Sequence, residues 1–279
     1  MSRQAKSRTG EKARLDQLLV DRGLAGGRGE AQRLIEDGLV SSSGVLLRRT
    51  GQAVALDIQL VVEHPPVAYA SRGGLKLAAA LDRFPVAVAG VVALDTGAST
   101  GGFTDVLLRR GAARVYAIDV GYGQLAWTLR TDPRVVVMER VNIRYLQELP
   151  ERPALATIDV SFISLDLVLP AIRRLLADDG QAICLIKPQF EAGKRYVGKG
   201  GVVRDPEAHA MVLRRVLGRA RDDDWRVGGL LRSPITGPAG NREFLAWLHH
   251  GPAADDDDLE RSIAGVLSGP DSPSSERAI

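Results

Sequence analysis

The chain has 279 residues, of which 45% are hydrophobic and 25% charged, and its formal net charge is +3. This composition is typical of a globular chain with one large core and a small additional domain. Its single cysteine, Cys184, excludes an internal disulfide, and its four histidines lack zinc-motif spacing, so we expect no metal site. Because no apolar run follows the basic start or approaches the length of a membrane span, we expect a cytoplasmic protein that binds no membrane.

Charge is unevenly distributed along the chain. Residues 251–279 contain seven acidic and two basic side chains, so the other 250 residues have a net charge of +8. A basic body suggests a polyanionic partner, although a solvated charged face is the commoner cause of so modest an excess. The acidic segment 251–279 is also rich in serine, proline and glycine, which predicts a disordered tail.

Residues 11–62 are predicted to form a small α+β domain. Apolar residues recur at helical spacing in 14–22 and 28–37, and the two stretches end at Gly23 and Gly38. The runs that follow predict a hairpin around Ser43-Gly44 and a further strand in 54–62. Four arginines on or beside the two helices are candidate phosphate contacts, namely Arg14, Arg22, Arg28 and Arg33. Residues 63–70, which include two prolines, are predicted to be an extended linker.

Strand and helix patterns alternate through residues 71–250. Apolar strand patterns occur in VVALDTG, ARVYAIDV, RVVVME, ALATIDVS and QAICLIK, with helical stretches between them, and two closing strands follow in WRVGGLLRSPI and REFLAWL. Such alternation predicts an α/β domain with a mostly parallel sheet that is covered by helices on both faces.

A glycine-rich turn, LDTGASTGGFTD at 94–105, follows the first strand of this domain. Glycines let the backbone turn tightly and approach a ligand closely, although a tight turn with no ligand remains an alternative. Asp95 ends the strand, where a carboxylate would repel a pyrophosphate but attract the sulfonium and ammonium groups of S-adenosylmethionine. Asp119 ends the next strand, where an acid can accept both ribose hydroxyls. The sequence therefore favours S-adenosylmethionine as the cofactor.

Four charged residues are predicted to meet at the same edge of the sheet. Asp159 and Lys187 each end a strand, Lys76 lies on the first helix of the domain, and Glu243 begins a strand near its end. A lysine near an alcohol stabilises the developing alkoxide or, when neutral, takes its proton. Taken alone, a lysine at a strand end is more often simply solvated, so the case for Lys187 depends on the other three residues.

These motifs resemble a known family. The large domain resembles the FtsJ-like ribose 2′-O-methyltransferases, whose Lys–Asp–Lys–Glu tetrad corresponds to Lys76, Asp159, Lys187 and Glu243. The chain to about residue 250 resembles the TlyA family, named both as haemolysins and as ribosomal RNA 2′-O-methyltransferases, in the strings SRGGLKL, DTGASTGGFTDVLL, DVGYGQLAW, DVSFISL, KPQFE, GKGGVV and GNREFL. Residues 11–62 resemble the RNA-binding domain of the ribosomal protein S-four type.

The resemblance implies a Rossmann-like class I methyltransferase that methylates a ribose 2′-hydroxyl, of a cytidine, in small- or large-subunit ribosomal RNA. Lys187 would activate the hydroxyl, Asp159 and Glu243 would orient it, and Lys76 would position the substrate. The cofactor-binding residues would be Asp95, Gly97, Ala98, Ser99, Gly101, Gly102, Phe103, Asp119, Val120 and Asn142.

Several readings remain beside this one. Phe103, Tyr122 and Trp127 could stack on adenine or a base, but we expect core packing for each. The glycine-rich basic segment 191–203 fits a loop near RNA or an inert surface loop. The partner would be ribosomal RNA or a ribosomal subunit. The alternative functions are a membrane-lytic haemolysin and a non-catalytic RNA-binding assembly factor.

Overall fold

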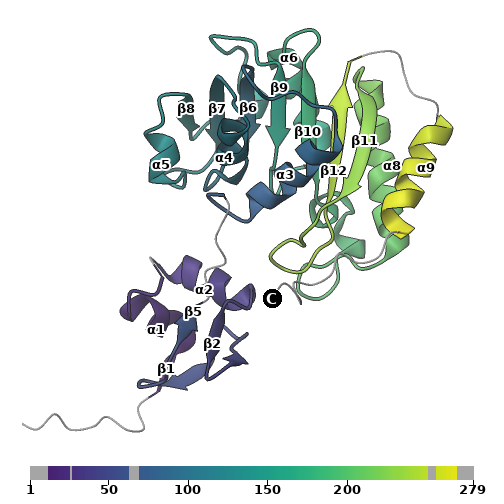
Figure 1. Ribbon diagram of the computed structural model, residues 1–279. Helices are drawn as coiled ribbons and strands as arrows, with labels where there is room; N and C mark the ends of the chain where they lie inside the picture. Colours follow the sequence, from purple (N-terminus) through teal and green to yellow (C-terminus); the bar gives the residue numbers. More distant parts are fainter. Residues whose placement is uncertain (1–11, 26, 63–68, 251–255, 269–279) are drawn as a thin grey trace, which may run out of the picture. The chain divides into compact units, whose positions relative to one another are not determined.

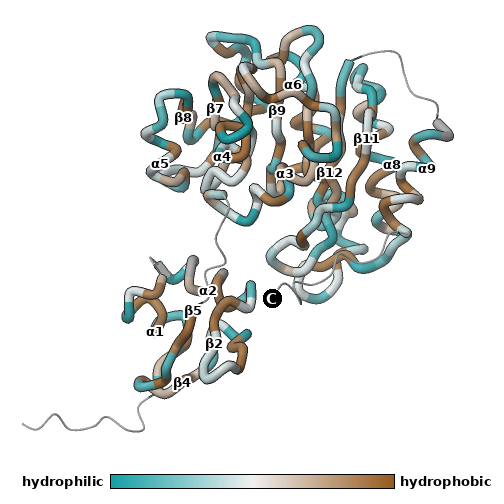
Figure 2. Tube along the Cα trace, in the orientation of Figure 1, coloured by the Kyte–Doolittle hydropathy of each residue, from teal (hydrophilic) through white to brown (hydrophobic). Residues whose placement is uncertain are grey.

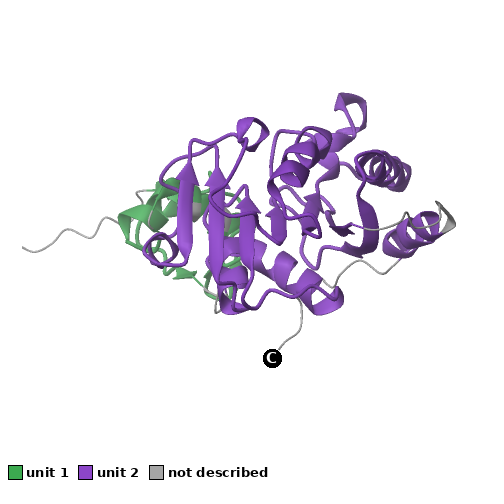
Figure 3. Cartoon of the chain, turned by 90° about the horizontal axis from the view of Figure 1, so that it is seen from above, with its two compact units in different colours: residues 1–67 green, residues 68–279 purple. Residues whose placement is uncertain are grey.

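The computed structural model describes residues 12–25, 27–62, 69–250 and 256–268. The chain forms two compact units that divide between residues 67 and 68 (Figure 3). The predicted linker lies almost entirely outside the described residues, as do 251–255 and 269–279 of the predicted tail. Each unit has hydrophobic clusters of its own.

The small unit contains two helices and two small sheets. Its elements are β1 (Lys12–Arg14), α1 (Leu15–Asp21), α2 (Arg28–Glu36), β2 (Val40–Ser42), β3 (Val45–Leu46), β4 (Ala53–Ala55) and β5 (Val61–Val62). Strand β1 pairs with β4, and β2 lies between β3 and β5, all antiparallel. The hairpin is confirmed: Ser43 and Gly44, at φ 49° and 79°, form the turn between β2 and β3.

One strand prediction in this unit is wrong. Residues 54–62 do not form a single strand but contribute β4 and β5 to different sheets. A turn separates them, in which the Ile58 N–H donates to the Ala55 carbonyl at 3.1 Å. Asp57 lies within this turn, and aspartate is disfavoured in strands because its side chain competes for backbone hydrogen bonds.

The large unit is built on a seven-stranded sheet in the order β11-β12-β10-β9-β6-β7-β8 (Figure 1). The strands are β6 (Val92–Thr96), β7 (Arg114–Asp119), β8 (Val135–Glu139), β9 (Leu155–Ile158), β10 (Gln181–Ile186), β11 (Arg226–Arg232) and β12 (Phe244–His249). Strands β6 to β10 are parallel, and β12 pairs antiparallel with both β10 and β11. The mostly parallel α/β prediction is confirmed.

Helices cover both faces of this sheet. The helices are α3 (Gly73–Arg83), α4 (Gly102–Arg109), α5 (Trp127–Arg130), α6 (Leu169–Leu175), α7 (Pro188–Glu191), α8 (Pro206–Asp222) and α9 (Asp256–Ser268), with short 3-10 helices η1 (Ile143–Tyr145), η2 (Leu165–Leu167) and η3 (Lys194–Tyr196). Successive strand side chains face opposite sides: Ala93 and Ile183 pack with α3 and α4, whereas Leu94 and Cys184 pack with α6 and α8. Because both faces are buried, the central strands are predominantly apolar (Figure 2).

Helix α9 corrects the prediction of a wholly disordered tail. Arg214 on α8 forms a two-pronged ion pair with Glu260, at 2.8 and 2.9 Å, and Ile263 is 1% exposed in the core. Leu259, Ile263 and Val266 recur at helical spacing, so one face of the segment is apolar although its composition is acidic. Among the described residues, no helix combines the length and the apolar character needed to cross a membrane.

Candidate active site

The site lies where the parallel strands of the large unit end. Strands β7 and β9 flank β6 on opposite sides, so the crossover connections diverge here, which is where open α/β sheets bind ligands. A cavity of about 480 Å³ opens at this edge. Five of the predicted cofactor-binding residues line it, namely Gly97, Ser99, Asp119, Val120 and Asn142. Much of the remaining wall is apolar and comes from Ile118, Val141, Ile143, Ile163 and Val168.

The backbone of the glycine-rich turn explains two of its glycines. Gly97 has φ +82°, and a Cβ at this position would lie 2.5 Å from the carbonyl oxygen of Asp159. Gly101 has φ +97°, and its Cβ would lie 2.2 Å from Leu129 Cδ1. Any larger residue would therefore be strained and would clash. Gly97 lines the cavity, whereas the absence of a side chain at Gly101 allows the start of α4 to pack against Leu129 of α5.

Asp119 is held in place by backbone donors. Its Oδ2 accepts from the Ser99 N–H at 2.8 Å and its Oδ1 from the Gly121 N–H at 2.7 Å. Each oxygen keeps a free lone pair. This arrangement presents a preoriented acceptor to the cavity. Asn142 lines the opposite part of the wall and also caps η1, since its side chain accepts from the Arg144 N–H.

Asp95 lies beneath the turn and does not line the cavity. It is fully buried, and the hydroxyls of Thr104 and Thr157 donate to its two oxygens at 2.6 and 2.9 Å. Burial raises the pKa of this carboxyl to about 6, while the two hydroxyl donors oppose the shift. The other predicted cofactor residues that do not line the cavity are Ala98, Gly101, Gly102 and Phe103. They pack the turn and α4 from behind, and Phe103 is 3% exposed.

The four predicted catalytic residues form two ion pairs. Lys187 Nζ lies 2.6 Å from Asp159 Oδ1 and donates to Ser161 Oγ at 2.8 Å. Lys76 Nζ lies 2.5 Å from Glu243 Oε2. The two pairs are close to each other. Ile186, which precedes Lys187, pairs with Phe244, which follows Glu243. Gly73, at the start of the helix that carries Lys76, lies near Asp159: a Cβ on it would be 3.9 Å from Asp159 Oδ2. The structure therefore brings the tetrad together at the edge of the cavity that Asp159 lines.

The two pairs differ in solvent access. The Lys76 and Glu243 side chains are 7% and 1% exposed, whereas those of Lys187 and Asp159 are 11% and 22% exposed. We refer to them as the closed pair and the open pair. Lys187 follows β10 in an extended conformation, and Pro188 then starts α7. Lys187 is largely buried and paired with a carboxylate, so it is not the solvated strand-end lysine that the sequence also allowed.

Two residues near the open pair were not predicted. The Ser161 hydroxyl accepts from the Lys187 ammonium. Ser161 lies in the string DVSFISL, but no role of its own was predicted for it. Phe162 lines the cavity, is 90% exposed and has φ +62°. An exposed aromatic residue in a left-handed conformation is rare and often marks a functional site. An exposed position was not expected for Phe162, because phenylalanine is hydrophobic and is usually buried.

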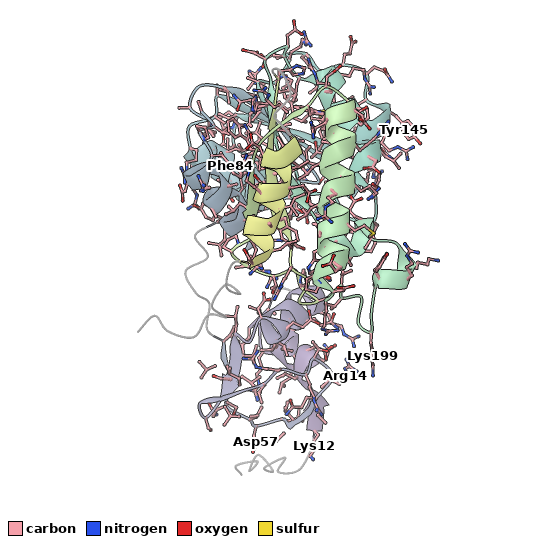
Figure 4. All side chains as sticks on the ribbon, turned by 90° about the vertical axis from the view of Figure 1, so that its right-hand side faces the viewer. Lys12, Arg14, Asp57, Phe84, Tyr145 and Lys199 are labelled. Atoms are coloured by element: carbon pink, nitrogen blue, oxygen red, sulfur yellow. The ribbon has the colours of Figure 1, made fainter. Side chains whose placement is uncertain are left out.

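The expectation of core packing holds for Phe103 but is wrong for Tyr122 and Trp127. These two side chains are 68% and 74% exposed. Tyr122 lies in the connection after β7, and Trp127 is the first residue of α5. Tyr122 lies under the guanidinium of Arg140, 4.3 Å from the ring centroid. Figure 4 shows a further exposed aromatic residue, Tyr145, projecting from the surface of the large unit.

In the small unit, the predicted phosphate contacts have intramolecular partners. Arg14 and Arg28 pair with Asp16 at 2.9 and 3.2 Å, and Arg22 donates to the carbonyls of Leu56 and Ile58. The Arg14 hydrogen bond holds the pKa of the Asp16 carboxyl well below its usual range. Arg14 and Arg28 are still 52% and 56% exposed, so part of each guanidinium faces solvent. The side chain of Arg33 lies outside the described part.

This combination of fold, cavity and tetrad defines a methyltransferase, and comparison with known proteins agrees. Residues 69–250 match the FtsJ-like methyltransferase family, and the chain belongs to that family. YqxC of Bacillus subtilis is 52% identical over 244 residues, covering 86% of this chain and 87% of that protein. The protein named 16S/23S rRNA (cytidine-2′-O)-methyltransferase TlyA, from Mycobacterium tuberculosis, is 50% identical over 240 residues, covering 85% of this chain and 90% of that protein.

Structural comparison gives the same relationship. A solved structure of a hemolysin-type protein from Streptococcus thermophilus matches with a TM-score of 0.72 at 42% identity, over 91% of this chain and 95% of that chain. The chain is therefore a TlyA-type member of the family. The predicted resemblance of the large domain is confirmed, whereas the S-four-type assignment of residues 11–62 stays a prediction.

Proposed function

We propose that this protein transfers a methyl group from S-adenosylmethionine to the 2′-hydroxyl of a cytidine ribose in ribosomal RNA, and that it does so in the cytoplasm. The observation that carries the proposal is the open pair, Lys187 with Asp159, at the rim of a cavity that fits a nucleoside-sized ligand. Small-molecule sites are mostly apolar clefts of roughly 300–1,000 Å³ with a few fixed polar groups.

The residues of the cavity fit the cofactor. Asp119 offers carboxylate lone pairs suited to the ribose hydroxyls, the apolar wall suits adenine, and Gly97 allows close approach of the backbone. Asn142 lies where its amide can meet a polar edge of the base. The buried Asp95 supports the turn from below, and its charge acts on the sulfonium only through the intervening backbone. When bound, S-adenosylmethionine supplies the electrophilic methyl group.

The tetrad supplies the help that a ribose hydroxyl needs, because the high pKa of an alcohol makes it a poor nucleophile. The Lys187 ammonium, between Asp159 and Ser161, stabilises the oxygen as its proton leaves. In the balanced reaction the 2′-O–H bond breaks, an O–CH₃ bond forms, the carbon–sulfur bond breaks, and one proton is released. Glu243 fixes Lys76, which positions the nucleotide.

Binding of the RNA is assigned to both units. The half-exposed guanidinium groups of Arg14 and Arg28 suit phosphate contacts, and the basic character of the chain outside 251–279 favours a polyanion. Ribosomal RNA is the substrate named for the TlyA relative, and that name is the reason to test ribosomal subunits first.

The test is methyl incorporation from labelled S-adenosylmethionine into isolated small and large ribosomal subunits. Methylating the 2′-oxygen removes the nucleophile that cleaves RNA in alkali, so the product linkage should resist alkaline hydrolysis and the methyl should stay with the sugar. Incorporation into a base, or a linkage that still cleaves in alkali, would contradict the proposal. The absence of incorporation would favour a non-catalytic assembly factor. Leakage from liposomes would favour the membrane-lytic reading.

A further inference from the structure

A single buried amide joins two loops at the catalytic edge of the large unit. Asn241 is 2% exposed and precedes the catalytic Glu243 by two residues. Its Oδ1 accepts from the Val203 N–H at 2.9 Å, and its Nδ2 donates to the Gly201 carbonyl at 2.9 Å. Both polar atoms of the side chain are thus directed at one segment, 198–203, which is far away in the sequence.

The same segment is held from its other side. His209 on α8 is fully buried, and its Nε2 lies 3.1 Å from the Val203 carbonyl. Because a carbonyl only accepts, this nitrogen carries the proton, and burial lowers the pKa of the ring, which favours the neutral form. The Val203 peptide is therefore fixed at both its N–H and its C=O, by Asn241 and His209 respectively.

The rest of the segment forms a glycine-rich turn with two backbone hydrogen bonds of its own, from the Gly198 N–H to the Val202 carbonyl at 3.0 Å and from the Gly201 N–H to the Gly198 carbonyl at 3.1 Å. Gly200 and Gly201 both have positive φ, at +80° and +77°, and a Cβ on either would meet no atom within 4 Å. Glycine has the largest conformational freedom to lose on ordering. The local bonds close the turn but do not attach it to the rest of the large unit. Its attachment therefore depends on Asn241, which binds Val203 and Gly201, and on His209, which binds only the Val203 carbonyl.

The anchored loop carries positive charge toward solvent. Lys194, Lys199 and Arg204 are exposed, and the part of the chain that the structure describes provides no ion pair or hydrogen bond for any of their charged groups. Figure 4 shows Lys199 at the outer end of this loop. The loop begins six residues after Lys187, and Asn241 attaches it to the segment that leads to Glu243. Unpaired cations beside a site that acts on RNA suit the phosphates that flank the reacting ribose.

From these observations we infer that Asn241 is a positioning residue for the RNA substrate: its amide locks the cationic loop 193–204 to the turn before Glu243. The inference rests on the proposed function, because it names the polyanion that this loop receives. Glu243 does not depend on the lock. Its carbonyl accepts from the Ser233 N–H at 2.9 Å, and the next residue, Phe244, pairs with Ile186 and Arg232 in the sheet.

Loss of the lock should therefore separate the two kinetic constants. The loop would be released while the tetrad stays in place, so KM for RNA should rise and kcat should be retained. Asn241→Asp is the sharpest variant, because it keeps the size of the side chain and the acceptor for Val203. It replaces the donor to Gly201 with a second oxygen, which opposes the Gly201 carbonyl. Asn241→Ala removes both hydrogen bonds.

The experiment measures kcat and KM with isolated ribosomal subunits, together with S-adenosylmethionine affinity and melting temperature. We expect KM for RNA to rise at least tenfold in both variants, with kcat within threefold of wild type and cofactor affinity unchanged. Asp205→Ala is the matched control. It removes the N-cap of α8 on the same connection, where Asp205 accepts from the Glu207 N–H at 3.0 Å, and it should lower the melting temperature without raising KM.

The outcomes are distinct. Unchanged KM in the Asn241 variants would overturn the inference, as would a fall in kcat at constant KM, which would assign Asn241 to Glu243 instead. An equal rise in KM in Asp205→Ala would reduce the effect to general destabilisation and would also overturn it. If Asn241→Ala does not fold, the isosteric Asn241→Asp decides. Absence of methylation by the wild-type protein would refute the proposed function itself, independently of Asn241.

Discussion

The α-carbon of Gly97 packs against the backbone of Asp159, so the turn that lines the cavity touches the residue that pairs with Lys187. Neither position can shift without moving the other. The contact couples the two functions of the site through the backbone, independently of any side chain.

Gly97→Ala should therefore weaken cofactor binding and turnover together. The added Cβ would lie 2.5 Å from the Asp159 carbonyl oxygen and would also occupy a positive φ. We expect at least tenfold losses in S-adenosylmethionine affinity by calorimetry and in kcat by methyl incorporation. Gly90→Ala is the control, since Gly90 has φ +75° with no atom within 4 Å of the added Cβ. It should cost only the backbone strain of about 1 kcal/mol and leave the kinetics unchanged. Normal cofactor affinity in Gly97→Ala would contradict the coupling.

Lys187→Ala should abolish turnover with little effect on cofactor affinity or folding. The lysine belongs to the more accessible pair and does not line the cavity, while its ammonium is the charge nearest to Asp159. A fall in kcat of about 10²–10³-fold is typical for the loss of one group that stabilises a developing negative charge on oxygen. Methyl incorporation into ribosomal subunits measures it, with calorimetry as the control for cofactor binding. Turnover close to that of the wild type would remove Lys187 from the mechanism.

Lys76→Ala should differ by also destabilising the fold. Its removal leaves the Glu243 carboxylate, which is 1% exposed, without a counter-charge. Breaking one partner of a buried pair costs roughly 3–5 kcal/mol. Chemical denaturation should show this loss for Lys76→Ala and a much smaller one for Lys187→Ala. Equal stabilities of the two variants would show that the closed pair is not closed in solution.

Asp95 should make stability fall as pH rises. Burial raises its pKa from 3.8 to about 6, so the folded state binds a proton more tightly than the unfolded state. The stabilising protonated form is complete near pH 4 and is lost as pH rises through about 6, a change on the order of 3 kcal/mol. Asp95→Asn should remove this component. The free energy of unfolding of Asp95→Asn minus that of the wild type should therefore be larger, meaning that the variant is relatively more stable, at pH 7.5 than at pH 5. Parallel pH profiles of the two proteins would exclude this role of Asp95.

Arg28→Gln should weaken RNA binding without changing cofactor affinity. The guanidinium is 56% exposed beside Asp16, so it can contact a phosphate while keeping its internal partner. Each lost phosphate contact reduces the slope of log affinity against log salt by roughly one. Arg134→Gln, in which a large-unit arginine paired with Asp132 is neutralised, is the control and should leave the slope intact. Identical slopes for Arg28→Gln and wild type would argue against the small unit as an RNA contact.

Local pattern predicted most of the sheet and the tetrad, because the signals are strong there. Lys187 follows an unbroken apolar strand and precedes a proline, and Asp159 follows another such strand. The ends of parallel strands meet at one edge, so position in the chain was enough to bring them together. The pairing itself was not predictable. Which lysine meets which carboxylate depends on the approach of α3 to β12, a contact between residues 167 positions apart.

The misses have physical reasons of the same kind. Asp95 was expected at the cavity because it ends a strand, but its side chain faces Thr104 and Thr157 instead. Successive side chains of a strand face opposite sides of the sheet, so a difference of one residue changes the side that a side chain faces. Tyr122 and Trp127 were expected inside because aromatic residues usually are, but they lie in the connection after β7 and at the start of α5, where both side chains are exposed. The apolar face of α9 was hidden by acidic neighbours, since net composition does not report periodicity.

Glu243, which directly precedes β12, is also among the last parts of the large unit to be synthesised. This strand is inserted between β10 and β11 and is made after every other strand of the sheet. Chains emerge from the ribosome N-terminal end first. While β12 is still untranslated, the nascent chain therefore lacks the carboxylate that pairs with Lys76. Under the proposed function, the tetrad is incomplete until translation of the chain is nearly finished.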